Sequence, residues 1–274
     1  MKVRYSFSSR RTGKIKNIRK QRQKYPTILE KLINNSDIVL EILDARFINE
    51  TRNYEIEEYL KKQKKHLVYV INKSDLKEAE KLSIFPHIFI SCKNRTGIKE
   101  LRNIIKKTAK EIKEPVDKNS NKIMVGIIGY PNTGKSSLIN LLIGRKSAKT
   151  GADAGFTKGI QKLKLSGNII LLDSPGVIPK KEYSSTESEK IAKHTKLGGR
   201  SYSQIKEPEI VVTILMKDFP GILQKHYEIN ADSEEDLIEK LGRQKNFLKK
   251  GNQVDDDKTS RFILKEWQEG KIKT

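Results

Sequence analysis

The sequence predicts an α/β fold in which a mainly parallel sheet is covered by helices on both faces, followed by a smaller helical unit. Short apolar runs at residues 38–43, 67–71 and 123–128 have the length of buried strands, and each ends at polar or glycine residues. Amphipathic stretches follow these runs, and such alternation is typical of parallel sheets that bind ligands at the carboxyl ends of their strands. Beyond residue 180 the chain becomes polar and basic and then reads as helices alone.

The remaining elements are expected in the following order. Apolar residues at helical spacing predict three helices, and further apolar patterns predict a strand and a hairpin around Gly167-Asn168, in chain order: helix 28–33, helix 56–60, strand 87–91, helix 98–112 and hairpin 161–172. The polar stretch 114–122 reads as a linker. In the last third, Ser233 caps a helix, and Trp267 is interpreted as a core anchor rather than a stacking platform for a base.

Residues 129–137 read GYPNTGKSS and lie between a strand-like and a helix-like run, the context that a phosphate-binding loop requires. The glycines let backbone amides turn towards phosphate oxygens, and the following helix adds its positive amino-terminal end. Lys135 supplies a charge for the outer phosphates, and Ser136 supplies a hydroxyl for Mg²⁺. We therefore assign nucleotide binding to this loop, through Asn132, Thr133, Gly134, Lys135, Ser136 and Ser137.

A motif upstream of this loop indicates which base is bound. Asn72-Lys73-Ser74-Asp75 follows the strand at 67–71, and the Asp75 carboxylate can accept from both the ring N–H and the exocyclic amine of guanine. Adenine offers no such donor pair, which disfavours an adenine-nucleotide enzyme. After the next strand, Ser91-Cys92-Lys93 are similar to the loop behind the base oxygen of GTPases. These two motifs favour GTP and GDP.

Two loops downstream complete a nucleotide-responsive set. Thr157 lies in a glycine-rich stretch suited to a first switch, and Asp173-Ser174-Pro175-Gly176 has the Asp-x-x-Gly pattern of a second switch. We expect Ser136 and Thr157 to ligate Mg²⁺ directly and Asp173 to reach it through water. Lys135, Thr157 and Gly176 are the expected catalytic set.

The order of these motifs is unusual. In an ordinary small GTPase the phosphate loop comes first, whereas here the guanine motif and the base loop precede it. This order resembles the circularly permuted GTPases that act in assembly of the large ribosomal subunit. Local sequence motifs also resemble those of this family, at Asp44-Ala45-Arg46, Thr51-Arg52-Asn53 and residues 155–159. The resemblance covers residues 25–180 and, more loosely, the C-terminal segment.

The resemblance implies a division into three parts. We expect a basic arm at 1–25, a circularly permuted GTPase domain with the P-loop GTPase fold at 26–180, and a helical RNA-binding domain at 181–274. The linker at 114–122 is then the place where the two ends of an unpermuted domain are joined, because domain termini lie close together.

Composition fits a protein that binds a polyanion. The net charge is +22 and the pI about 9.8, which points to nucleic acid. Cys92 is the only cysteine, so no intramolecular disulfide can form and a reducing compartment is expected. The sequence contains no apolar run of membrane-spanning length and no signal-peptide core. We expect a cytoplasmic monomer without a membrane partner.

Two basic stretches are candidates for rRNA contact. Residues 1–24 hold ten Lys and Arg and no acid, which suits an RNA-contacting arm, a solvated tail without a specific role, or an organelle transit peptide. The second stretch, 240–250, suits either a solvated helix face or an RNA-binding surface. Its arrangement resembles the RNA-binding tail of the assembly GTPases, which favours rRNA in the precursor large subunit.

Hydrolysis is expected to be slow in the free protein. Val177 stands where many GTPases place a glutamine that orients the attacking water. Asn132 matches the asparagine with which cation-dependent GTPases hold potassium, although a role in stabilising the loop is equally open. The four histidines lack metal-ligand spacing. We interpret the chain as a GTP-hydrolysing assembly factor stimulated by ribosomal particles and potassium, the alternative being a nucleotide-sensing RNA-binding switch with negligible hydrolysis.

Overall fold

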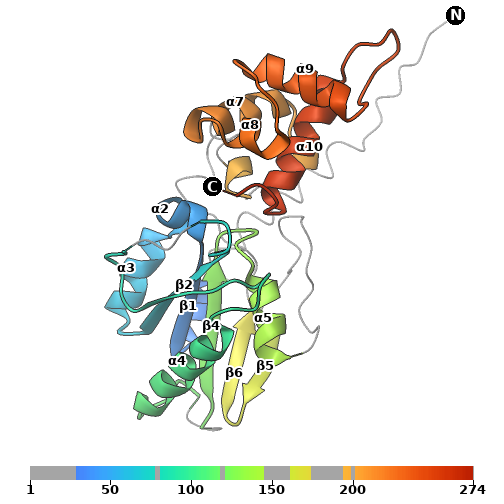
Figure 1. Ribbon diagram of the computed structural model, residues 1–274. Helices are drawn as coiled ribbons and strands as arrows, with labels where there is room; N and C mark the ends of the chain where they lie inside the picture. Colours follow the sequence, from blue (N-terminus) through green and yellow to red (C-terminus); the bar gives the residue numbers. More distant parts are fainter. Residues whose placement is uncertain are drawn as a thin grey trace, which may run out of the picture.

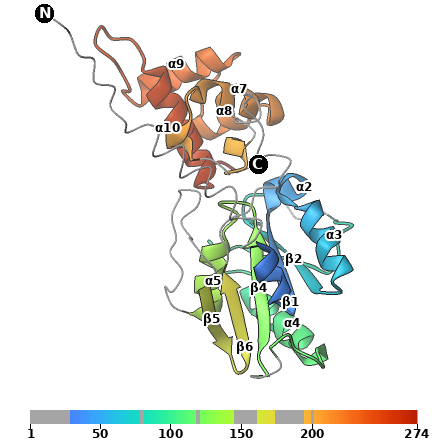
Figure 2. The same cartoon turned by 180° about the vertical axis from the view of Figure 1, so that it is seen from behind.

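The computed structural model describes residues 29–77, 81–117, 121–144, 161–173, 194–198 and 201–273. These residues form a six-stranded sheet with helices on both faces and, beyond one end of the sheet, a helical C-terminal unit (Figure 1, Figure 2). The predicted fold class is confirmed. The expected arm at 1–25 and the expected boundary at residue 180 lie outside the described residues, so the three-part division stays a prediction.

The sheet-bearing part contains the elements β1 (Ile38–Asp44), η1 (Ala45–Phe47), α2 (Ile48–Thr51), α3 (Tyr54–Lys62), β2 (His66–Asn72), β3 (His87–Phe89), α4 (Ile98–Glu111), β4 (Ile123–Gly129), α5 (Lys135–Ile143), β5 (Gln161–Ser166) and β6 (Ile169–Asp173). Residues 29–34 are also helical. The C-terminal unit contains η3 (Tyr202–Gln204), α7 (Pro208–Asp218), α8 (Ile222–Tyr227), α9 (Glu234–Gln244) and α10 (Asp256–Gln268).

The strands follow the order β3-β2-β1-β4-β6-β5. All neighbours are parallel except β5 and β6, which form the predicted antiparallel hairpin. The register pairs Asp44 with Asn72 and Ile127 with Asp173. Because the carboxyl ends of parallel strands meet at one edge of a sheet, the residues that end β1, β2, β4 and β6 are gathered there.

Helices cover both faces of the sheet because its central strands are apolar on both sides. In β1, Ile38, Leu40 and Ile42 pack into the core that contains α4 and α5. Val39 points the other way, into the core formed with α3 and the helix at 29–34. This alternation follows from the two-residue repeat of a strand, and the continuous burial along β1 is typical of parallel sheets.

The strand expected at 87–91 is shorter, and the structure shows why. Ser91 N donates to Thr96 O at 3.1 Å, and Thr96 N donates back to Ser91 O at 3.2 Å. The chain therefore turns back on itself at Ser91 instead of continuing along β2. The predicted cap of α9 is present, since Ser233 Oγ accepts from Asp236 N at 3.2 Å.

The predicted linker is fastened to the sheet by a residue that sequence analysis did not single out. The Asp37 carboxylate is buried and accepts from Val116 N and from Met124 N, both at 2.7 Å. Asp37 N also donates to Met124 O at 2.8 Å. One carboxylate thus holds both sides of the join between α4 and β4, at the end of the sheet opposite to the polar strand ends.

A second buried carboxyl group lies within β1. Glu41 Oε1 accepts from Asn53 N at 2.8 Å, just before α3. Burial, together with the nearby Glu57 charge, raises the pKa of Glu41 to about 8. Glu57 is held by Arg52, whose guanidinium donates to both carboxylate oxygens, at 2.8 and 2.6 Å. This group ties the segment after β1 to the first turn of α3.

The C-terminal unit has its own apolar core, and that core includes two residues from the sheet-bearing part. Phe47 and Tyr130, each 1% exposed, pack with residues of α7 to α10. Trp267, also 1% exposed, lies in the same core, as predicted. Among the residues that the structure describes, no helix is both long and apolar enough to cross a bilayer.

Candidate functional site

The phosphate-binding loop lies between β4 and α5, as predicted. Gly134 stands at the amino end of α5 with a left-handed φ of 98°. A Cβ atom built there would lie 2.2 Å from Asn72 Nδ2, so glycine is required both by the backbone conformation and by the neighbouring side chain. The loop ends in the first turn of α5, where Ser136 and Ser137 are half-buried. The free backbone amides of this turn favour a bound anion.

Lys135 is buried and folded over the loop. Its ammonium group donates to Gly129 O at 3.0 Å and to Tyr130 O at 2.7 Å. Burial lowers the pKa of Lys135 to about 8, and the nearby Asp173 charge acts in the opposite direction. Asp173 ends β6, beside the strand that leads into the loop, and is 1% exposed. A lysine and a carboxylate therefore meet at the place expected for phosphate and Mg²⁺.

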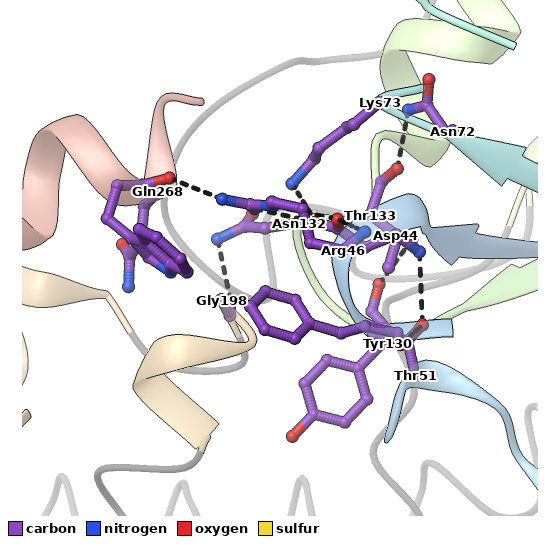
Figure 3. Close-up of polar contacts among 12 residues, drawn as sticks. Asp44, Arg46, Thr51, Asn72, Lys73, Tyr130, Asn132, Thr133, Gly198 and Gln268 are labelled. Carbon is purple, nitrogen blue, oxygen red and sulfur yellow. Dashed lines mark hydrogen bonds and ion pairs between the residues drawn. The ribbon is translucent and has the colours of Figure 1, made fainter. Parts of the chain in front are cut away.

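Asn72 joins three loops through its carboxamide. Its Nδ2 donates to Thr133 O in the phosphate loop at 2.8 Å (Figure 3). Its Oδ1 accepts from Cys92 N in the base loop at 3.1 Å. The three motifs assigned from the sequence are therefore brought together by one side chain, although the two ends of the Asn72–Thr133 bond are 61 residues apart.

The residues expected to surround the base lie on two adjacent loops. Asp75 Oδ1 accepts from Ser91 Oγ at 2.5 Å, and Ser91 Oγ accepts from Asn94 N at 3.0 Å. Ser91 thus fixes one Asp75 oxygen and ties the guanine motif to the base loop. Cys92 is partly buried, which raises the pKa of its thiol to about 12, while Lys93 is exposed. The thiol stays neutral at physiological pH and acts as a small packing group.

The Lys73 ammonium group does not point at the base loop. Lys73 Nζ donates to Asp44 Oδ2 at 2.7 Å, and Arg46 holds the same carboxylate with Nη2 to Oδ2 at 2.9 Å and Nε to Oδ1 at 3.1 Å (Figure 3). Burial alone would raise the pKa of Asp44, but these two cations outweigh it and hold that pKa well below its usual range. Sequence analysis quoted Asp44 and Arg46 only for their resemblance and gave them no role.

Asn132 has a left-handed φ of 59° and reaches out of the loop. Its Nδ2 donates to Gly198 O at 2.9 Å, which links the phosphate loop to the segment before the C-terminal unit. Thr133 Oγ1 accounts for the shape of the loop, because it donates to Tyr130 O at 2.9 Å. Thr157, Gly176 and Val177 lie outside the described residues, so their assigned roles stay predictions.

The residues present fit a nucleoside phosphate with its magnesium ion. Within the described part of the chain, no three His, Cys, Asp or Glu side chains gather as a metal cage. Mg²⁺ usually takes only one or two protein ligands and draws the rest from phosphate and water. Ser136 and Asp173, beside the buried Lys135, supply a set of that kind.

Comparisons with known proteins agree with this site. A family model described as 50S ribosome-binding GTPase matches residues 124–248. An uncharacterized GTP-binding protein of Methanocaldococcus jannaschii is 35% identical over 256 residues, covering 89% of this chain and 65% of that protein. Nucleolar GTP-binding protein 2 is 32% identical in Pneumocystis carinii and 33% identical in Saccharomyces cerevisiae, where the match covers 89% of this chain and 52% and 51% of those proteins. The chain thus spans about half to two thirds of the length of these relatives.

A solved structure shares the whole fold. GNP-bound YlqF from T. maritima matches with a TM-score of 0.61 at 22% identity, over 90% of this chain and 94% of that chain. In the present structure, β1 and β2, with the guanine motif, precede β4 and the phosphate loop in the chain. In fold and in the order of its motifs, the chain is similar to the circularly permuted GTPases. The predicted resemblance is confirmed, and the guanine motif lies upstream of the region that the family model matches.

The close approach of Asn72 to Gly134 can be tested by substitution. We expect Gly134→Ala to weaken GDP binding at least about tenfold, because the added Cβ displaces the Asn72 amide that orders the loops. Fluorescent-nucleotide titration measures the effect. Gly144→Ala is the matched control: Gly144 ends the same helix with a φ of 78°, and nothing lies within 4 Å of its Cβ position. The control should lose only about 1 kcal/mol of stability. Equal GDP affinity in the two variants would contradict the role of Gly134.

Proposed function

We propose that this chain binds GTP and GDP, hydrolyses GTP, and acts on the rRNA of a precursor large ribosomal subunit. The observation that carries the nucleotide assignment is the convergence of the phosphate loop, the guanine motif and the base loop on the Asn72 carboxamide. The names of the relatives support the link to GTP, and the description of the matching family model supports the link to the ribosome.

Guanine recognition is assigned to Asp75. One of its oxygens already accepts from Ser91 Oγ, which fixes the orientation of the carboxylate before the base arrives. A carboxylate pre-oriented in this way accepts the two parallel donors of guanine without paying the entropy of ordering a free side chain. A base that lacks those donors leaves the carboxylate poorly paired, which is the source of discrimination.

Phosphate binding and hydrolysis are assigned to the loop before α5. Lys135 exchanges its two carbonyl acceptors for phosphate oxygens, while the amides of the first turn of α5 bind the remaining oxygens. Ser136, Asp173 and Thr157 would hold Mg²⁺, which would neutralise charge that develops on the phosphates. Thr157 and Gly176 are assigned the contact to the γ-phosphate. Val177 offers no hydrogen bond to the attacking water, so turnover of the free protein is slow.

We assign potassium the part that an arginine finger plays elsewhere. Asn132 belongs to the phosphate loop and has a left-handed φ of 59°. A potassium ion held there would stabilise charge on the leaving phosphate. Because Asn132 also binds Gly198 O, the same side chain would join the ion site to the segment before the C-terminal unit.

RNA binding is assigned to the C-terminal unit. Lys240 and Arg243 on α9 are paired with Asp236 and Glu239, as in a solvated helix face. In the turn after α9, residues 245–254, Lys249 and Lys250 are exposed, and Lys249 Nζ lies 3.5 Å from Asp255 Oδ1. Gly251 and Asn252 adopt left-handed conformations there. We call this segment the lysine turn. Exposed lysines on a projecting turn are suited to phosphate contacts along an RNA backbone.

The expected monomeric state and cytoplasmic compartment stay predictions. The fungal relatives are named nucleolar proteins. An RNA-contacting role for the arm at 1–25 is proposed on charge alone.

Asp75→Asn tests guanine recognition. The asparagine oxygen can still accept from Ser91 Oγ, so the loop should keep its shape, but the amide replaces one acceptor with a donor. We expect GDP affinity to fall at least about 100-fold and affinity for xanthosine diphosphate to rise, because xanthine presents an oxygen where guanine has its amine. Titration with both nucleotides measures this change. Unchanged preference for GDP would remove Asp75 from the base site.

Hydrolysis is tested by comparing salts and particles. We expect slow turnover in sodium chloride, at least about tenfold faster turnover in potassium chloride of equal concentration, and further stimulation by precursor large-subunit particles. Phosphate release is the readout, and Lys135→Ala serves as the inactive control. Equal rates in both salts would remove the potassium role of Asn132. No turnover under any condition would favour a nucleotide-sensing switch without hydrolysis.

RNA binding by the lysine turn is tested with two matched charge reversals. Lys249→Glu with Lys250→Glu should weaken co-sedimentation with large-subunit particles at least about tenfold and should flatten its salt dependence. Lys106→Glu with Lys107→Glu changes the net charge equally, at two exposed positions of α4, and should have little effect. If both pairs weaken binding to the same extent at fixed salt, net charge rather than the lysine turn carries the interaction.

A further inference from the structure

A buried cluster of three charges lies between the guanine motif and the C-terminal unit. The Asp44 carboxylate accepts from Lys73 at 2.7 Å and from Arg46 at 2.9 and 3.1 Å. The side chains of Asp44 and Arg46 are 1% and 2% exposed, whereas that of Lys73 is 20% exposed. Two cations thus pair with one desolvated anion. A displacement of either cation therefore changes the electrostatic interaction of the other cation with Asp44.

The opposite side of the Arg46 guanidinium contacts helix α10. Arg46 Nη1 donates to Trp267 O at 3.2 Å, and the guanidinium carbon lies 4.9 Å from the centre of the Trp267 ring and 5.2 Å from that of Phe47. Phe47 in turn packs against Phe219 of the C-terminal unit, with ring centres 5.9 Å apart. Arg46 therefore spans the boundary between the two parts of the chain. One edge of its guanidinium binds Asp44, and another edge binds α10.

We propose that Arg46 is a positioning residue that couples Lys73 of the guanine motif to the seating of α10, so that the C-terminal unit responds to an occupied guanine pocket. This inference rests on the proposed guanine-nucleotide site. When a base orders the loop that carries Lys73, the ion pair between Lys73 and Asp44 changes. The ion pair between Arg46 and Asp44 then changes as well, and so do the contacts of Arg46 with Trp267. The planar guanidinium binds the carboxylate with a forked pair on one edge and Trp267 O on another, a geometry that an ammonium group does not reproduce.

This link is distinct from the one through the phosphate loop. Asn132 contacts Gly198 O, and Gly198 belongs to the segment that Trp267 and Gln268 hold through Lys196 O at 3.0 Å and Thr195 O at 2.9 Å. That route starts at the phosphates and can distinguish GTP from GDP. The Arg46 route starts at the base, which both nucleotides share. Its signal should therefore be the same for GDP and for a GTP analogue.

Trp267 provides a direct readout because it is the only tryptophan in the chain. Its indole is buried against the Arg46 guanidinium, so a shift of that charge alters its fluorescence emission. We would excite the full-length protein at a wavelength that guanine does not absorb and record emission on addition of GDP, a non-hydrolysable GTP analogue or ADP. Isothermal titration calorimetry on the same samples would establish separately whether each nucleotide binds.

In the wild-type protein, saturating GDP should change the Trp267 emission, the GTP analogue should produce at least the same change, and ADP should produce none. If calorimetry detects no binding of GDP, the proposed function itself fails. If GDP binds without changing the emission, or if only the GTP analogue changes it, the proposed function survives and the Arg46 coupling is overturned. These wild-type measurements decide the question even where a variant does not fold.

Arg46→Lys and Arg52→Lys form the matched pair of variants. Both arginines follow β1, form forked bonds to a carboxylate and lie over aromatic rings, but Arg52 pairs with Glu57, away from Lys73 and α10. Arg46→Lys should reduce the GDP-induced change to below about a third of the wild-type amplitude and weaken GDP binding about tenfold. Arg52→Lys should keep both. Full amplitude in a folded Arg46→Lys protein would overturn the proposal.

Discussion

The Asn72 carboxamide is the interaction on which the candidate site depends. It donates to the phosphate loop at Thr133 O and accepts from the base loop at Cys92 N, so it fixes the distance between these two loops. The absence of a side chain at Gly134 is what allows this amide to come so close. Because the bond is tertiary, it forms equally well whichever of its two loops comes first in the chain, and the permutation leaves the site intact.

The two parts of the chain are less independent than a division by sequence suggests. Phe47 and Tyr130 come from the sheet-bearing part, yet their side chains are buried in the core of the C-terminal helices. Burying an aromatic side chain of this kind contributes about 1.5–3 kcal/mol. Tyr130 is itself a residue of the phosphate loop, and its carbonyl accepts from Lys135. The shape of the loop and the seating of the helical unit therefore share residues as well as hydrogen bonds.

The strand ends and the nucleotide motifs could be predicted from the sequence because each depends on local pattern. Strand length, apolar repeat and a glycine loop before a helix placed Asn72, Asp75, Ser91 and Lys135 correctly in relation to the fold. Asp37 and Arg46 could not be assigned, because an acid or an arginine next to a strand has no recognisable signature until its partners are known. Val116, which binds Asp37, is 79 residues away from it, and Trp267, which binds Arg46, is 221 residues away. Likewise, charge density alone could not show that Lys240 pairs with Asp236 and Lys249 with Asp255.

The permuted strand order also determines when the site can exist during synthesis. A ribosome makes β1, β2 and β3 before β4, yet β4 lies between β1 and β6 at the centre of the sheet. Until β4 has emerged, one edge of β1 lacks its parallel neighbour, and the Asn72 amide has no Thr133 carbonyl to bind. Domains generally fold as units once their strands are available. The part that carries the guanine motif therefore remains an incomplete sheet at this stage, and the candidate site can form only after the phosphate loop has left the ribosome.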